Sequence, residues 1–137
     1  MKYKSFRDLK VWQLSSSLSR DISTILVPSF PKKELVRLGD QIIRSSRSVP
    51  SQIAEGFRKN SLKEKNRYYS IAATSNDETE NHLTEAKNNT YVSDDIYRLY
   101  FNRVVAIRIL LSKLMQSIRN MDRKNIVKAL NHSRRES

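Results

Sequence analysis

Apolar side chains recur every three or four residues over most of the chain, the spacing that places them on one face of an α-helix. The first such segment covers residues 8–27 and ends before Pro28, and a second covers about residues 33–58. Pro50 lies inside the second segment without shifting its pattern, so we expect a kink or a brief break there rather than two separate helices.

Two hydroxyl residues mark the starts of the remaining segments. Ser61 followed by Glu64 fits a capping box, so a third helix should run from there to about Lys87. Ser93, followed by two acidic residues, opens a fourth segment whose apolar positions alternate at spacings of three and four up to residue 121. After residue 121 the chain is basic and polar, and there we expect a frayed tail, in which Ile126, Val127 and Leu130 could make one more short helix.

Four helices joined by short loops pack best as an antiparallel up-and-down four-helix bundle, in which each helix covers the apolar faces of its neighbours. We expect residues 1–121 to form this all-α domain and residues 122–137 to form a basic C-terminal tail. With only 2 Gly and 3 Pro, the chain has too few turn residues for a domain of many short strands. The apolar content of 38% is low, so either the core is thin or the chain shares a core with copies of itself.

The charge of the chain points to a polyanionic partner. Lys and Arg number 26 against 14 Asp and Glu, a net charge of +12, distributed as +9 in residues 1–67, −4 in residues 68–100 and +7 in residues 101–137. Such an excess attracts nucleic acid through long-range Coulomb forces and counterion release. The alternative is that the charge serves solubility alone.

Several classes of protein lack support in the sequence. There is no Cys, hence no thiolate ligand or cysteine nucleophile. There is no phosphate-binding loop, dinucleotide fingerprint or serine-nucleophile elbow, and Glu78, His82 and Glu85 share a helix face without matching ligands elsewhere. We therefore expect no catalytic residue, no metal and no cofactor. Without a long apolar run or a signal peptide, we expect a cytoplasmic protein with no membrane partner.

Three stretches of the chain resemble a known family. They are Phe6-Arg7-Asp8-Leu9-Lys10-Val11-Trp12-Gln13, Phe30-Pro31-Lys32, and Ser48-Val49-Pro50-Ser51-Gln52-Ile53-Ala54-Glu55-Gly56-Phe57. Over residues 5–119 the chain is similar to the bacterial four-helix bundle proteins named after the 23S rRNA intervening sequence. The resemblance implies a homopentamer, similar in architecture to the accessory variability determinant of diversity-generating retroelements, a basic pentamer that binds RNA and a reverse transcriptase. It thus implies assembly and nucleic-acid binding, not enzymatic activity.

The centre of the third helix departs from that family. Asn76 and Thr79 stand where the family usually has Leu. If these side chains face inward they need hydrogen-bond partners, because an unpaired buried amide costs about 1–3 kcal/mol. Either the interface of the pentamer supplies those partners, or the helix is rotated outward.

Basic residues form three candidate groups for contact with phosphates. One group lies near the N-terminus, where Tyr3 and Phe6 could stack exposed nucleotides or simply dock on the bundle. Another lies at the turn between the second and third helices, and a pair lies on the second helix. A solvated surface is the alternative in each case. The candidate residues are Lys2, Lys4, Arg7, Lys10, Arg44, Arg47, Arg58, Lys59, Lys63, Lys65 and Arg67.

From these observations we expect a non-enzymatic, homo-oligomeric scaffold that binds nucleic acid, RNA in the first place, through phosphate contacts with little base specificity. The alternative is an accessory adaptor that holds a protein partner such as a reverse transcriptase. A structural or regulatory oligomer without a nucleic-acid partner is the third hypothesis.

Overall fold

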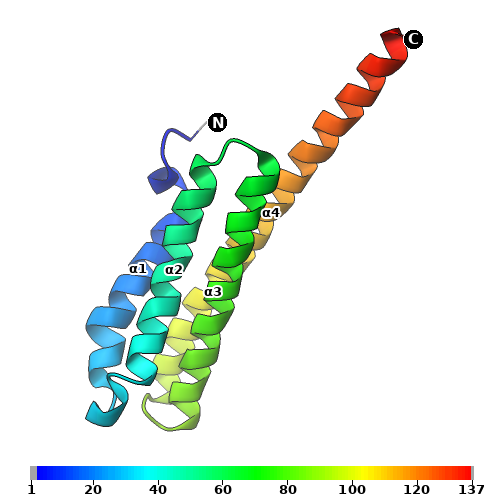
Figure 1. The fold of residues 1–137 in the computed structure, drawn as a ribbon. Helices are drawn as coiled ribbons and strands as arrows, with labels where there is room; N and C mark the ends of the chain where they lie inside the picture. Colours follow the sequence, from blue (N-terminus) through cyan, green and yellow to red (C-terminus); the bar gives the residue numbers. More distant parts are fainter. Residues whose placement is uncertain (1–2, 137) are drawn as a thin grey trace.

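The structure, a computed structural model that describes residues 3–136, consists of four long helices with no strand in that part of the chain (Figure 1). This confirms the predicted all-α fold with four helices. Short 3₁₀ turns flank α1 at Phe6–Asp8, Val27–Ser29 and Lys32–Glu34, and a π-helical turn spans Ile22–Leu26. The long helices are α1 (Lys10–Asp21), α2 (Leu38–Arg58), α3 (Leu62–Asn88) and α4 (Asp94–Glu136).

Consecutive helices run in opposite directions along the bundle (Figure 1). Asn66 Nδ2 donates a hydrogen bond to the carbonyl oxygen of Met115 at 3.1 Å, and Asn76 Nδ2 donates to that of Val104 at 3.0 Å. The later residue on α3 thus contacts the earlier residue on α4, which means that these two helices run in opposite directions. The N-terminal segment and the α2–α3 turn therefore lie at one end of the bundle. The α1–α2 and α3–α4 connections lie at the other end (Figure 1).

The predicted starts of α3 and α4 agree with the structure. Ser61 Oγ accepts from the backbone N–H of Glu64 at 3.1 Å, and Ser93 Oγ accepts from that of Ile96 at 3.2 Å, which satisfies free donors of each first turn. The second helix begins at Leu38, five residues later than expected, because the preceding residues form a 3₁₀ turn. It continues through Pro50 as one helix, so the brief break expected there is absent.

The core contains the residues that the helical period places inward, among them Ile42 and Ile53 of α2 and Leu111 of α4, which are essentially inaccessible to solvent. Small residues let α2 and α3 approach closely. Gly56 lies against the buried ring of Tyr69, and a Cβ at this position would come within 2.8 Å of Tyr69 Cε1. The helices are therefore packed at a distance that only the absence of a side chain permits.

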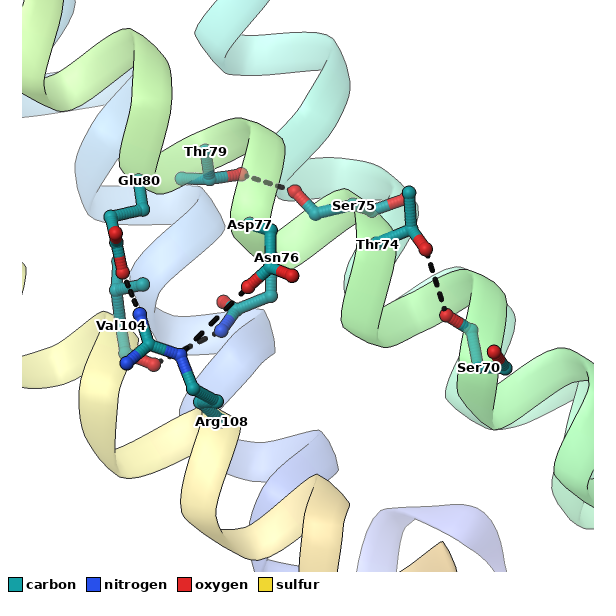
Figure 2. A network of polar contacts seen from close by, with 9 residues as sticks. All are labelled: Ser70, Thr74, Ser75, Asn76, Asp77, Thr79, Glu80, Val104 and Arg108. Carbon is teal, nitrogen blue, oxygen red and sulfur yellow. Dashed lines mark hydrogen bonds and ion pairs between the residues drawn. The ribbon is translucent and has the colours of Figure 1, made fainter.

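Asn76 and Thr79 face the interior of the bundle and find partners within the same chain (Figure 2). Thr79 Oγ1 lies 2.9 Å from the Ser45 hydroxyl and donates to the carbonyl oxygen of Ser75, while Asn76 reaches across to Val104 on α4. The outward rotation of α3 is wrong, because both side chains are buried. Thr79 is satisfied within the chain by the Ser45 hydroxyl and the Ser75 carbonyl, whereas Asn76 is paired through its Nδ2 atom alone and its Oδ1 atom has no partner among the described residues.

The expected frayed tail is also wrong. The helix α4 continues without interruption from Asp94 to Glu136 and projects beyond the other three helices (Figure 1). No Gly or Pro occurs between these residues, and five of the residues from 122 to 136 are Arg or Lys, which lose little freedom in a helix. Side chains from Met121 to Glu136 are exposed, so the basic tail is a solvated helical arm.

Candidate nucleic-acid interface

Three basic segments that are distant in the sequence meet at one end of the bundle. A hollow of about 510 Å³ there is lined by residues of the N-terminal segment, the end of α2, the start of α3 and the middle of α4. The three segments cover residues 3–10, 55–67 and 113–136. Together they hold 15 of the 26 Lys and Arg residues but only 5 of the 14 Asp and Glu residues. This basic end therefore carries most of the net charge. The lining residues are Tyr3, Leu9, Phe57, Lys65, Tyr69, Leu114, Ser117, Ile118 and Met121.

Phe6 brings two predicted arginines together at the basic end. The guanidinium carbon of Arg7 lies 5.0 Å from the centroid of the Phe6 ring, and that of Arg58 lies 5.1 Å from the same centroid. The two guanidinium groups are thus within about 10 Å of each other. A guanidinium that packs on a ring keeps its N–H donors at its edge, where they can contact phosphate oxygens. Both side chains are exposed.

Phe6 itself is docked on the bundle. Its ring packs edge to face on Trp12 with the centroids 5.1 Å apart, and it is only partly exposed. With arginines and an indole around it, this ring is not a free platform for a nucleotide. Tyr3, by contrast, is 49% exposed. Of the two predicted stacking rings, the structure leaves Tyr3 accessible and gives Phe6 the role of holding Arg7 and Arg58.

At the α2–α3 turn, Tyr68 and Glu64 engage two other predicted cations. Lys59 Nζ lies 4.9 Å from the centroid of the Tyr68 ring, and the guanidinium carbon of Arg67 lies 4.8 Å from it. Arg67 also forms an ion pair with Glu64 at 2.9 Å, and this hydrogen bond lowers the pKa of the Glu64 carboxyl. Lys59 is therefore available to an anion at its exposed side, while Arg67 is already paired with a carboxylate.

Lys65 and Lys63 have different surroundings although both belong to the same predicted cluster. Lys65 Nζ donates to the carbonyl oxygen of Phe57 at 2.6 Å, near the end of α2, and desolvation lowers the pKa of its ammonium group. Lys65 thus closes the turn and satisfies a terminal helix carbonyl. Lys63 is exposed on the first turn of α3. Within the cluster, Lys63 is free to meet a ligand and Lys65 is largely structural.

The structure separates the remaining predicted residues. Lys4 and Lys10 are exposed at the basic end, next to Arg7. Arg44 and Arg47 lie midway along α2, and Arg44 lines a polar hollow with Glu78 and His82 of α3 rather than joining the other cations. Lys2 lies outside the described residues.

Sequence reasoning missed the cations of α4 as candidate ligands. The basic end also includes exposed Lys and Arg side chains of the projecting helix, which the expectation of a frayed tail left out. The net charge of +7 over residues 101–137 was the signal that could have found them. They are Lys113, Arg119, Arg123, Lys124, Lys128, Arg134 and Arg135.

Two other kinds of site are absent from residues 3–136. No three His, Asp or Glu side chains in this range lie close enough together to hold a metal ion. No helix in the same range has an apolar stretch long enough to cross a membrane.

Comparison with known proteins places the chain in a family. The solved structure of a protein of unknown function from the S23 ribosomal protein family of Bacteroides thetaiotaomicron is similar, with 22% identity and a TM-score of 0.69 over 77% of this chain and 97% of that chain. At this identity the likeness shows the fold alone. No curated protein matches the sequence. A family model described as 23S rRNA-intervening sequence protein matches residues 7–113, most of the chain. The chain therefore belongs to the family of 23S rRNA-intervening sequence proteins.

Proposed function

We propose that the protein is a non-enzymatic RNA-binding scaffold whose basic end contacts phosphates. The observation that carries this proposal is the joining of Arg7 and Arg58 on the Phe6 ring, from segments about fifty residues apart. Holding two guanidinium groups in place lowers the entropy that each loses when it binds an anion. Lys4, Lys10 and Lys63 add exposed positive charge at the same end.

Self-association is the second part of the proposal. The family resemblance implies a homopentamer, and α4 exposes apolar side chains that a single copy does not cover, including Leu99 at 57% and Ile109 at 49% exposed. A ring of copies would repeat the basic end, and several weak phosphate contacts would then act together. Light scattering on the purified protein tests this part, and a monomer at micromolar concentration would contradict it.

The test of RNA binding is a salt titration with a paired set of variants. We expect a labelled structured RNA to bind the wild-type protein with an affinity that falls steeply between about 50 and 200 mM salt. The double variant R7Q/R58Q should bind at least about tenfold more weakly and lower the log-log salt slope by roughly 1.4–1.8, which is 0.7–0.9 per lost phosphate contact.

The control removes the same charge from the opposite end of the bundle. Lys32 and Lys33 are exposed in the α1–α2 connection, so K32Q/K33Q should leave RNA affinity close to the wild-type value. An equal loss of RNA affinity in the two double variants would show that RNA binding depends on net charge and not on the positions of Arg7 and Arg58. Absence of salt-dependent RNA binding by the wild-type protein would overturn the proposal.

An adaptor for a protein partner is the second candidate function. The projecting part of α4 exposes Ile126, Val127 and Leu130 at more than 50% each, and no described residue packs over them. Apolar side chains on a solvated helix favour contact with another protein. Co-purification of a reverse transcriptase that is lost in an I126S/L130S variant, with RNA bound only in that complex, would favour this function over direct RNA binding.

A further inference from the structure

The C-terminal half of α4 carries a line of positive charge that the bundle does not use. Lys113, Lys124, Lys128 and Arg135 follow one another at spacings of 11, 4 and 7 residues. Each spacing is close to a whole number of turns at 3.6 residues per turn, so the four side chains share one helix face. Ser117, Asn120 and Asn131 fall on the same face, and all seven residues are exposed. We call these seven residues the cationic row.

Carboxylates do not neutralise the row. In the part of the chain that the structure describes, no Asp or Glu forms an ion pair with Lys113, Lys124 or Lys128. The acidic residues of this half of α4 lie elsewhere, since Asp122 is two positions from Lys124, about 200° around the helix, and Glu136 pairs with His132 at 3.0 Å. The row therefore contains positive and neutral polar side chains but no negative one.

The length and stiffness of the row restrict the shape of its ligand. From Lys113 to Arg135 the helix rises about 33 Å at 1.5 Å per residue, long enough to follow a phosphate backbone over several consecutive nucleotides. The arm is one uninterrupted helix over this length (Figure 1). A straight row of fixed charges matches a ligand whose phosphates also have fixed positions.

The side chains of the row favour a duplex over a single strand. Proteins that hold single strands usually stack the bases on aromatic rings, and residues 113–135 contain no Phe, Tyr or Trp. The row offers ammonium, guanidinium, amide and hydroxyl groups, which contact phosphate and sugar oxygens. Of the nearby apolar residues, Ile126 and Leu130 point away from the row, two positions from Lys124 and Lys128, whereas Val127 lies at its edge.

We propose that the cationic row lies along the phosphate backbone of a double-stranded segment of RNA. This inference rests on the proposed function and deepens it: Arg7 and Arg58 hold the RNA, and the row selects double-stranded over single-stranded RNA. The row begins where the family match ends, at residue 113, so it is a property of this chain rather than of the matched region.

The first test compares two charge-matched quadruple variants of the full chain. K113Q/K124Q/K128Q/R135Q removes the row, and K32Q/K33Q/K87Q/R98Q removes four exposed charges from the other end of the bundle. The probes are a labelled RNA duplex of about 24 base pairs, about two helical turns, a polyuridine strand of equal length, and the matching DNA duplex.

We expect the row variant to bind the RNA duplex at least about tenfold more weakly than the control variant, with a salt slope lower by up to about 3.6, or 0.9 per contact. Polyuridine affinity should differ little between the two variants. Equal duplex affinity in the two variants would overturn the inference, and so would an equal loss for polyuridine. Tighter binding of the DNA duplex than of the RNA duplex would overturn RNA as the ligand.

A second variant tests geometry without changing charge. Ala129 is exposed within the arm, and A129P removes the hydrogen bond to the carbonyl of residue 125 and bends or breaks the helix in the turn before residue 129, between Lys124 and Lys128, whereas A129S keeps the helix intact. We expect A129P, but not A129S, to lose preference for the duplex. Wild-type duplex binding by A129P would overturn the inference. If binding depends on Arg7 and Arg58 but not on the row, the proposed function survives and only this inference fails.

Discussion

Replacing Asn76 by Leu should stabilise the protein although it removes a hydrogen bond from the core. The Asn76 side chain is 1% exposed, and its Nδ2 donates to the carbonyl oxygen of Val104 at 3.0 Å (Figure 2). Its Oδ1 atom is buried without a hydrogen-bond partner among the described residues. The amide is therefore only half satisfied, and one of its polar atoms is desolvated without compensation.

The expected size of the effect follows from three contributions. Removing the unpaired oxygen relieves about 1–3 kcal/mol, and losing the bond to Val104 costs about 0.5–1.5 kcal/mol. Burying a Leu side chain adds about 1.5–3 kcal/mol, from which repacking around its different shape subtracts about 1–2 kcal/mol. The net expectation for N76L is a free energy of unfolding higher by about 2 kcal/mol, or a Tm higher by about 8 °C for a chain of this size.

Urea unfolding followed by circular dichroism measures this change, with T79V as the contrasting variant. The Thr79 hydroxyl is paired with both Ser45 and the Ser75 carbonyl, so T79V removes satisfied bonds and should lower the free energy of unfolding by about 1 kcal/mol. Changes of opposite sign in the free energy of unfolding at these two neighbouring buried positions would indicate that Asn76 holds an unsatisfied polar atom. A lower stability of N76L than of the wild type would refute the reasoning, and a gain in T79V equal to that in N76L would show that apolar burial alone acts.

Three further predictions follow from close contacts near the basic end. G56A should lower the free energy of unfolding by about 1–3 kcal/mol in urea titrations, because the new Cβ would meet the buried Tyr69 ring at 2.8 Å; a neutral result would show that the ring can move. Burial raises the pKa of Tyr69 to about 12, so the contribution of this side chain to the free energy of unfolding is complete below pH 10. As the pH rises from 10 to 12, the tyrosine ionises in the unfolded state before it does so in the folded state, and the free energy of unfolding falls by up to about 2.7 kcal/mol. Unfolding curves of Y69F across that pH range should not show this loss. The same loss in Y69F as in the wild type would show that ionisation of Tyr69 is not its cause. K65Q should lower the Tm because the hydrogen bond to the Phe57 carbonyl is lost. K63Q should leave the Tm unchanged and weaken RNA binding. Equal effects of the two variants on the Tm would contradict the different roles of the two lysines.

The sequence alone determined the helices, because helix formation depends on local periods and caps that can be read along the chain. The spacing of apolar residues located four helices, and Ser61 and Ser93 located two of their starts. The end of α4 could not be read in the same way. A polar composition after residue 121 suggested fraying, but without Gly or Pro the helix has no residue that stops it, and it continues to Glu136.

Only the tertiary structure decided which residues meet, because contacts between helices depend on how the chain folds back on itself. The sequence identified Arg7 and Arg58 separately, and packing of the N-terminal segment against α2 brought both onto the Phe6 ring. The same folding separates Arg44 from this group and supplies Asn76 with a carbonyl of α4. Charge and periodicity are properties of segments, whereas a shared ring or a buried hydrogen bond is a property of pairs that lie far apart along the chain.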